Sequence, residues 1–247
     1  EVYVEDVFST YVYTGTGAAT RDITNGVDLD GKGGLVWTKC RSASYGNVLH
    51  DNEMSPETFL SSDISGGIYG GSTGADTYLS LNSDGYSIGD SQYVNESSRE
   101  YTSWTFAKDK GFFDVVTYTG TGASQTIPHN LKSAPGMIIV KATNSNFDWV
   151  VYHKSMGDYA NFLNIFGYYA SSNSLYVKLN DTGSVTQSDI AWDNTDPTAS
   201  GFTVGGDGRT GASGVEYVAY LFADDDPIFG TGEDESVIKC GGYTGNG

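Results

Sequence analysis

The feature that most constrains this chain is an internal repetition. The string YTGTGA stands at 13–18 and again at 118–123, and a shorter copy, YTGNG, stands at 243–247. Two other phrases recur in the same order: GLVWTK at 34–39 matches GMIIVK at 136–141, and REYTSWTFA at 99–107 matches VEYVAYLFA at 215–223. A Gly-rich bias explains one recurring phrase but not three in register, so the sequence indicates a tandem duplication.

The repetition divides the chain into three parts. We expect a first domain at 1–110, a second at 111–230, and, at 231–247, a linker followed by the first strand of an incomplete third repeat. Units of this size exceed the roughly 20–45 residues of a solenoid repeat. They match the size of small independent domains.

The residues within each repeat favour strands. The chain has 33 Gly and 18 Tyr but only 5 Pro, and short apolar runs alternate with Gly-, Asn- and Asp-rich turns. Strands at roughly 8–12-residue spacing are typical of sandwiches and barrels. We therefore predict an all-β fold of tandem β-sandwich domains, jelly-roll-like, related by internal duplication. Short helical turns are expected only at 54–60 and 159–165.

The charge of the chain restricts its partners. Thirty-one Asp and Glu against 13 Lys and Arg give a net charge of −18. Such a surface repels nucleic acid and anionic membranes. No apolar run approaches the ~18 residues of a membrane-spanning helix. We expect no nucleic-acid partner and no membrane insertion. The two cysteines, Cys40 and Cys240, match no metal or redox spacing, and we interpret them as ordinary thiols.

The motifs of catalysis do not occur in this sequence. There is no G-x-S-x-G and no H-E-x-x-H, and the GTG at 15–17 and 120–122 lacks the third glycine of a dinucleotide loop. The three histidines, at 50, 129 and 153, are few for a catalytic protein. We therefore predict that the chain is not an enzyme and has no required cofactor.

Two groups of residues remain as candidate sites. Trp149, Trp192, Tyr168 and Tyr169 lie in polar, loop-like stretches, where aromatic rings either stack on sugars or fill the core or an interface. The run Asp224, Asp225 and Asp226 supplies oxygen ligands of the kind that Ca²⁺ binds, although a solvated acidic linker explains it better. We carry the first group as glycan-binding candidates and the second as a weak structural-calcium candidate.

Several longer strings carry a family resemblance. FSTYVYTGTG at 8–17, ITNGVDL at 23–29, GGLVWTK at 33–39 and IPHNLKSAPGMIIVK at 127–141 occur together in fixed order. They resemble a repeated β-rich domain of tail and fibre-type virion proteins of tailed bacteriophages, often marine ones. One departure is the segment DNEMSP at 51–56, where such units often have a basic, Gly-containing turn.

The resemblance implies a structural component of the virion, displayed on the particle surface. Its expected partners are copies of itself and other virion proteins, with host-surface glycan as a further one. It implies no catalytic residues. The alternative interpretation is a lectin-like, glycan-binding module without catalysis.

Overall fold

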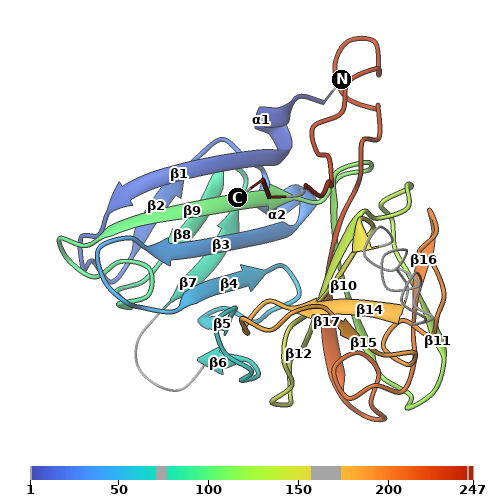
Figure 1. Cartoon of the computed structure of the whole chain (residues 1–247). Coiled ribbons are helices and arrows are strands. Elements are labelled where there is room, and N and C mark those ends of the chain that lie inside the picture. The colour runs from blue at the N-terminus through green and yellow to red at the C-terminus, as the bar shows by residue number, and fades with distance from the viewer. Residues whose placement is uncertain (1, 71–76, 157–173, 244, 247) are drawn as a thin grey trace. The chain divides into compact units, whose positions relative to one another are not determined.

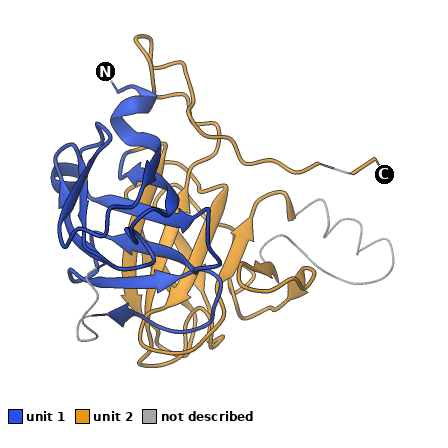
Figure 2. Ribbon diagram, turned by 90° about the vertical axis from the view of Figure 1, so that its left-hand side faces the viewer, with its two compact units in different colours: residues 1–109 blue, residues 110–247 orange. Residues whose placement is uncertain are grey.

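The computed structural model describes residues 2–70, 77–156, 174–243 and 245–246, and antiparallel strands are its main regular structure (Figure 1). The predicted all-β, sandwich-type fold is confirmed. The chain divides into two compact units, residues 1–109 and 110–247, which are coloured separately in Figure 2.

Unit 1 is a two-layer sandwich. Its elements, in chain order, are α1 (Val4–Val7), β1 (Phe8–Thr14), β2 (Arg21–Thr24), α2 (Leu29–Lys32), β3 (Gly34–Cys40), β4 (Asn47–Asp51), β5 (Thr58–Ser61), β6 (Tyr69–Gly70), β7 (Tyr78–Asn82), β8 (Gly85–Ile88) and β9 (Glu100–Ala107). Within the described part, the large sheet has the order β1-β9-β3-β4-β5-β6 and the small sheet β2-β8-β7. Tyr78 of the small sheet donates to the Thr38 hydroxyl of the large one, at 2.8 Å, which ties the layers together.

Unit 2 repeats this plan. Its strands are β10 (Phe113–Thr119), β11 (Gln125–Pro128), β12 (Met137–Ala142), β13 (Val150–His153), β14 (Leu175–Lys178), β15 (Thr186–Gln187), β16 (Gly201–Val204) and β17 (Glu216–Phe222). In the described residues, the large sheet has the order β10-β17-β12-β13-β14-β15, and β11 pairs with β16. Phe202 of β16 meets Tyr118 of β10 edge to face, at 6.1 Å between ring centroids, across the buried core.

The register of the large sheets shows how closely the units correspond. In unit 1, Leu35 pairs with Phe106; in unit 2, Met137 pairs with Phe222. Since the last strand of each unit lies between the first and the third, the repeated phrases of the sequence occupy the same three adjacent strands, which begin at one edge of each large sheet. The strand order is therefore the structural counterpart of the sequence duplication.

A pair of stacked tyrosines explains why the phrases recur together. The ring of Tyr13 stacks on Tyr101 at 5.3 Å, and the ring of Tyr118 stacks on Tyr217 at 5.1 Å. In each pair, one tyrosine comes from YTGTG and the other from the EY phrase at the end of the unit. Each phrase therefore requires the other, because burying two rings in contact stabilises both strands.

The glycines after the first tyrosine let the turn approach the loop that precedes the last strand. The Gly15 N–H donates to Arg99 O and the Gly17 N–H donates to Asn95 O, at 2.6 and 2.7 Å. A Cβ at position 15 would overlap the Glu96 carbonyl oxygen, and Gly17 has φ +67, which favours glycine. We call residues 92–99 the tyrosine loop, since its Val94 carbonyl oxygen also accepts a hydrogen bond from the Tyr13 hydroxyl.

Two local expectations differ from the structure. Residues 54–60 do not form a helical turn, because a hydrogen-bonded turn at Asp51–Met54 leads directly into β5. The stretch 237–243 is not a strand: the Asp225 N–H donates to Ile238 O, and the Asp224 carboxylate accepts from the Cys240 N–H, which holds the stretch against unit 2 in irregular form. The helical turn expected at 159–165 lies outside the described residues.

Candidate functional site

The two candidate tryptophans are both buried. Trp149 has 0% of its surface exposed and stacks on Tyr220, at 6.4 Å between ring centroids. Trp192 is 2% exposed, and its indole N–H donates to Leu175 O at 3.1 Å. Neither ring offers a free face to a sugar. Of the two roles that the sequence left open, sugar stacking and burial, the structure supports burial. Tyr168 and Tyr169 lie outside the described residues.

Two of the three consecutive aspartates bind protein donors through their side chains. Asp224 forms an ion pair with Lys154, and Asp225 forms one with Lys239, at 2.6 Å. Asp226 is partly exposed. Among the described residues, no group of three or more His, Cys, Asp and Glu side chains is placed to hold a metal ion. The structural-calcium hypothesis gains no support from these carboxylates.

Both cysteines are buried, free thiols, as the sequence predicts. Burial raises the pKa of the Cys240 thiol, whose S–H donates to Ala223 O. In the part of the chain that the structure describes, no helix is long and apolar enough to cross a membrane.

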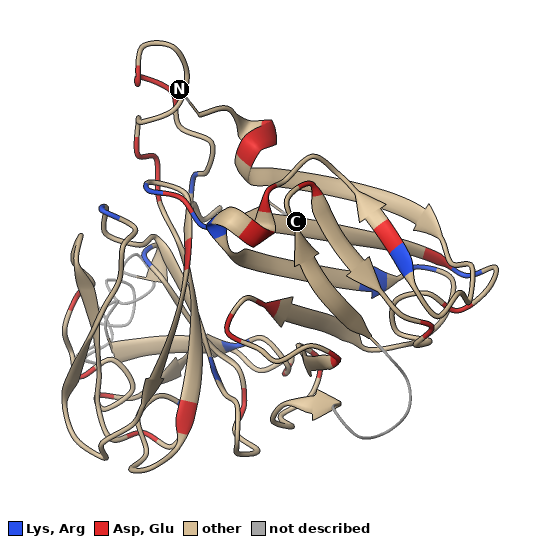
Figure 3. Cartoon of the chain, turned by 180° about the vertical axis from the view of Figure 1, so that it is seen from behind, with Lys and Arg blue, Asp and Glu red and all other residues tan. Residues whose placement is uncertain are grey.

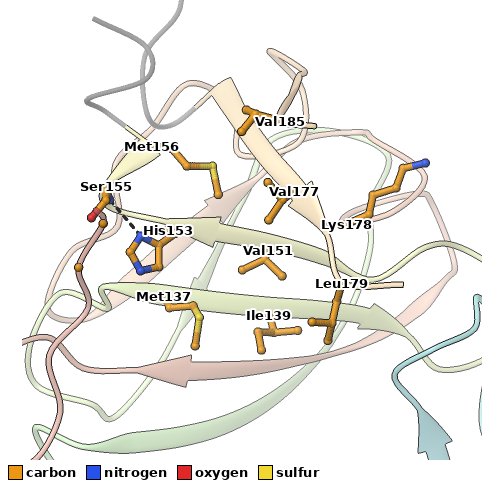
Figure 4. Close-up of a pocket in the computed structure, with 12 residues that line it drawn as sticks. Met137, Ile139, Val151, His153, Ser155, Met156, Val177, Lys178, Leu179 and Val185 are labelled. Carbon is orange, nitrogen blue, oxygen red and sulfur yellow. Dashed lines mark hydrogen bonds between the residues drawn. The ribbon is translucent and has the colours of Figure 1, made fainter. Parts of the chain in front are cut away.

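An open groove of about 550 Å³ lies on the outer face of the large sheet of unit 2 (Figure 4). Alternate positions on three adjacent strands turn apolar side chains into it, whereas the residues between those positions point into the core. The apolar side chains from these strands are Met137, Ile139, Val151 and Val177, and His153 and Lys178 line the groove beside them. Figure 4 shows His153 and Lys178 at different ends of the groove, so its middle suits apolar groups rather than proton transfer.

The environment of His153 fits an apolar groove. Burial lowers the pKa of its imidazole, and the neighbouring Lys154 lowers it further. Its Nδ1 accepts the Ser155 N–H at 3.2 Å, which leaves the ring neutral at physiological pH. The groove is therefore uncharged at this end.

A second surface feature lies on unit 1, where four aromatic rings touch in sequence. Tyr45 meets Tyr93 at 6.2 Å between ring centroids, Tyr93 meets Phe59 at 5.2 Å, and Phe59 meets Tyr69 at 5.8 Å. Tyr69 is 40% exposed and the other three rings are partly exposed. We call Tyr45, Tyr93, Phe59 and Tyr69 the aromatic row.

Three separate parts of the fold place these rings together. Tyr45 comes from the hairpin loop between β3 and β4, Tyr93 from the tyrosine loop, and the other two from the paired strands β5 and β6, where Phe59 is opposite Tyr69. The row therefore depends on the same loop that the YTGTG turn holds in place.

Polar groups lie at the Tyr45 end of the row. The Tyr45 hydroxyl donates to the Glu96 carboxylate at 2.6 Å, and Arg99 Nε donates to the same oxygen at 3.1 Å. These two interactions hold the pKa of the Glu96 carboxyl below its ordinary value. The pair supplies a fixed carboxylate and a fixed guanidinium, both partly exposed, next to aromatic surface.

Sequence reasoning missed both features, for different reasons. The apolar runs MIIV at 137–140 and WVVY at 149–152 do carry a signal, because a strand that is apolar at every position has a second face to cover. The aromatic row carries no local signal: its members are spread from 45 to 93, and only the strand pairing and the loop contacts bring them together.

Comparison with known proteins gives one match. No curated protein and no solved structure is significantly similar to the chain. Residues 4–247 match the model of a family described as a domain of unknown function, DUF7483. That match spans both compact units and nearly all of the sequence. The chain therefore belongs to the DUF7483 family.

Proposed function

We propose that the chain is a structural, non-catalytic segment of a tailed-phage virion, in a tail fibre, tail or capsid appendage on the particle surface. The observation that carries this proposal is the duplication. Two units share a strand order, a register and a stacked tyrosine pair, and extended assemblies gain length by repeating such a unit. The resemblance of several strings to a repeated domain of phage virion proteins points to the same assignment.

The surface of the chain supports a role in an exposed particle. Acidic side chains occur in both units, as Figure 3 shows, and the net charge is −18. A highly charged surface keeps a protein soluble at high concentration and disfavours non-specific binding to nucleic acid. Its expected partners are copies of the chain and other virion proteins, joined in a symmetric assembly.

The experiment that tests the proposal is localisation on purified particles. Antibodies raised against residues 111–230 are applied to gradient-purified phage and located by immunogold electron microscopy, with particles of an unrelated phage as the control. We expect label on a tail, fibre or capsid appendage. Label confined to the free protein in the lysate would overturn the structural assignment.

A non-catalytic glycan-binding module is the second candidate, and one observation favours it. The aromatic row combines partly exposed rings with a carboxylate and a guanidinium on one surface of unit 1. Both functions are compatible in one polypeptide, since a fibre that attaches to a host surface needs a contact site.

A further inference from the structure

The two units offer an internal comparison for the aromatic row. The Tyr13 hydroxyl donates to Val94 O, and the Tyr118 hydroxyl donates to Thr210 O. Val94 and Thr210 are thus equivalent, and the residues that precede them are Tyr93 in unit 1 and Arg209 in unit 2.

Strand pairing gives the equivalent of Phe59. Leu60 pairs with Leu49 in unit 1, and Val177 pairs with Val151 in unit 2. The residues immediately before these are Phe59 and Tyr176. The ring contact between Phe59 and Tyr93 in unit 1 therefore corresponds to a contact between Tyr176 and Arg209 in unit 2.

In unit 2, charged side chains cover the equivalent position. The Arg209 guanidinium lies 5.6 Å from the centre of the Tyr176 ring, and Asp207 holds it through hydrogen bonds of 3.0 and 3.2 Å. Beside them, Lys178 and Asp148 form an ion pair at 2.9 Å. The ring of Tyr176 is 2% exposed, so the site presents ion pairs rather than aromatic surface.

In unit 1 the same position is aromatic and accessible. Tyr93 replaces the arginine, and Ser61 stands where unit 2 has Lys178, because Val48 pairs with Ser61 as Val150 pairs with Lys178. Among the described residues, the ion pairs of unit 2 thus have no counterpart in the middle of the row. The two units share the strand order and register of their large sheets, and at this position they differ in the side chains that a ligand would meet.

We propose that the aromatic row binds a neutral polysaccharide, with sugar rings stacked on Tyr69 and Phe59 and sugar hydroxyls hydrogen-bonded to Glu96 and Arg99. The apolar C–H face of a pyranose matches the face of an aromatic ring. A carboxylate and a guanidinium in fixed positions accept from and donate to hydroxyl groups. This inference is independent of the structural role and rests on the second candidate function, glycan binding, whose site and ligand class it names.

The chemistry of the row and of the chain selects this class of ligand. A net charge of −18 opposes an anionic polysaccharide or a nucleic acid. Four rings in contact form a row rather than a single platform, which suits consecutive sugar units of a chain. Three of the four are tyrosines, whose hydroxyls add donors at the edge of the apolar surface.

The test uses the full chain and an array of immobilised neutral polysaccharides, namely dextran, mannan, galactan and β-glucan, with hyaluronan as an anionic comparison. Affinity for any polysaccharide that is retained is then measured by calorimetry. We expect retention on at least one neutral polysaccharide and none on hyaluronan. Retention on hyaluronan alone, or on no surface, overturns the proposal.

Matched variants then locate the site. Tyr69→Ala is expected to weaken binding about tenfold, whereas Tyr69→Phe keeps the ring and retains binding. Tyr93→Arg introduces the unit 2 residue and is expected to abolish binding. The control is Tyr243→Ala, which removes a tyrosine that is 97% exposed and lies outside the row.

Circular dichroism and thermal melting confirm that each variant is folded. Wild-type affinity in folded Tyr69→Ala and Tyr93→Arg would overturn the assignment to the row. This experiment is independent of particle labelling. Absence from particles would refute the structural role, whereas the binding assay alone decides glycan binding.

Discussion

Two equivalent lysines show how one residue type changes its environment between the units. Lys141 is fully buried, and its ammonium donates to Ala142 O at 2.8 Å and Phe147 O at 2.9 Å. Burial lowers the pKa of this ammonium to about 8. Lys39, at the same position of unit 1, is partly exposed and donates to Tyr45 O at 2.6 Å. Both ammonium groups close the hairpin loop that follows the strand.

We expect Lys141→Met to destabilise the protein far more than Lys39→Met. Loss of the buried ammonium leaves loop carbonyls without their donor, which costs about 2–4 kcal/mol. The loop carbonyl freed by Lys39→Met stays accessible to water, and the cost there is about 0.5–1 kcal/mol. Urea unfolding followed by circular dichroism measures both. Equal losses in the two variants would contradict the buried-donor explanation.

His50 makes the stability of unit 1 depend on pH. It is 3% exposed, stacks on Tyr78 at 5.0 Å between ring centroids, and has its Nδ1 2.8 Å from Thr58 O. Burial lowers the pKa of its imidazole from 6.5 to about 4. The folded protein keeps this ring neutral, while the unfolded chain takes up a proton below its pKa of 6.5.

Stability is therefore expected to fall as the pH decreases from about 6.5 to about 4, by about 3 kcal/mol from this residue alone. The free energy of unfolding in urea, measured at several pH values across that range, tests this. His50→Gln serves as the control, because it keeps a side-chain N–H near Thr58 O and does not titrate. A variant curve as steep as that of the wild type would assign the pH dependence to other groups.

At the scale of elements, the YTGTG turn of each unit is hydrogen-bonded to the loop that precedes the last strand of the same unit. We predict that Gly15→Ala and Gly120→Ala each destabilise the protein by about 2–3 kcal/mol. The added Cβ would overlap a carbonyl oxygen, that of Glu96 or Ala212 respectively, and backbone movement would weaken the adjacent hydrogen bonds. Thermal melting measures the effect.

The control for these variants is Gly241→Ala. Its added Cβ meets no atom within 4 Å and its backbone does not require glycine, so its melting temperature is expected to match the wild type. A neutral effect at position 15 would show that the turn adjusts, and that the repeated glycines are retained for a reason other than close packing.

The elements also show what the sequence allowed us to predict. The repeated phrases located three adjacent strands of each large sheet, because Tyr13 pairs with Tyr101 in the same register as Tyr118 pairs with Tyr217. The strand expected at 237–243 did not appear: the stretch is irregular, and Tyr243 is almost fully exposed rather than stacked on a second tyrosine.

The candidate site was less predictable, because it depends on contacts between distant segments. Trp149 looks surface-exposed in sequence since polar residues precede it, yet its ring is fully buried and stacks on Tyr220 of a distant strand. Conversely, Phe59 and Tyr93 meet only because the tyrosine loop passes β5. Such placement follows from tertiary packing, which local composition does not predict.

For the molecule as a whole, the net charge of −18 is expected to oppose folding. Like charges repel more strongly in the compact state, and salt screens this repulsion over about 10 Å at 0.1 M and about 3 Å at 1 M. Raising NaCl from about 0.02 to about 0.5 M at neutral pH should therefore raise the melting temperature. The same titration near pH 4.2, the isoelectric point, is the control, since little net charge remains there to be screened. If salt lowered the melting temperature at neutral pH, the attraction within specific ion pairs such as Lys178–Asp148 would outweigh the net repulsion between acidic side chains. The net charge would then not reduce the stability of the folded protein.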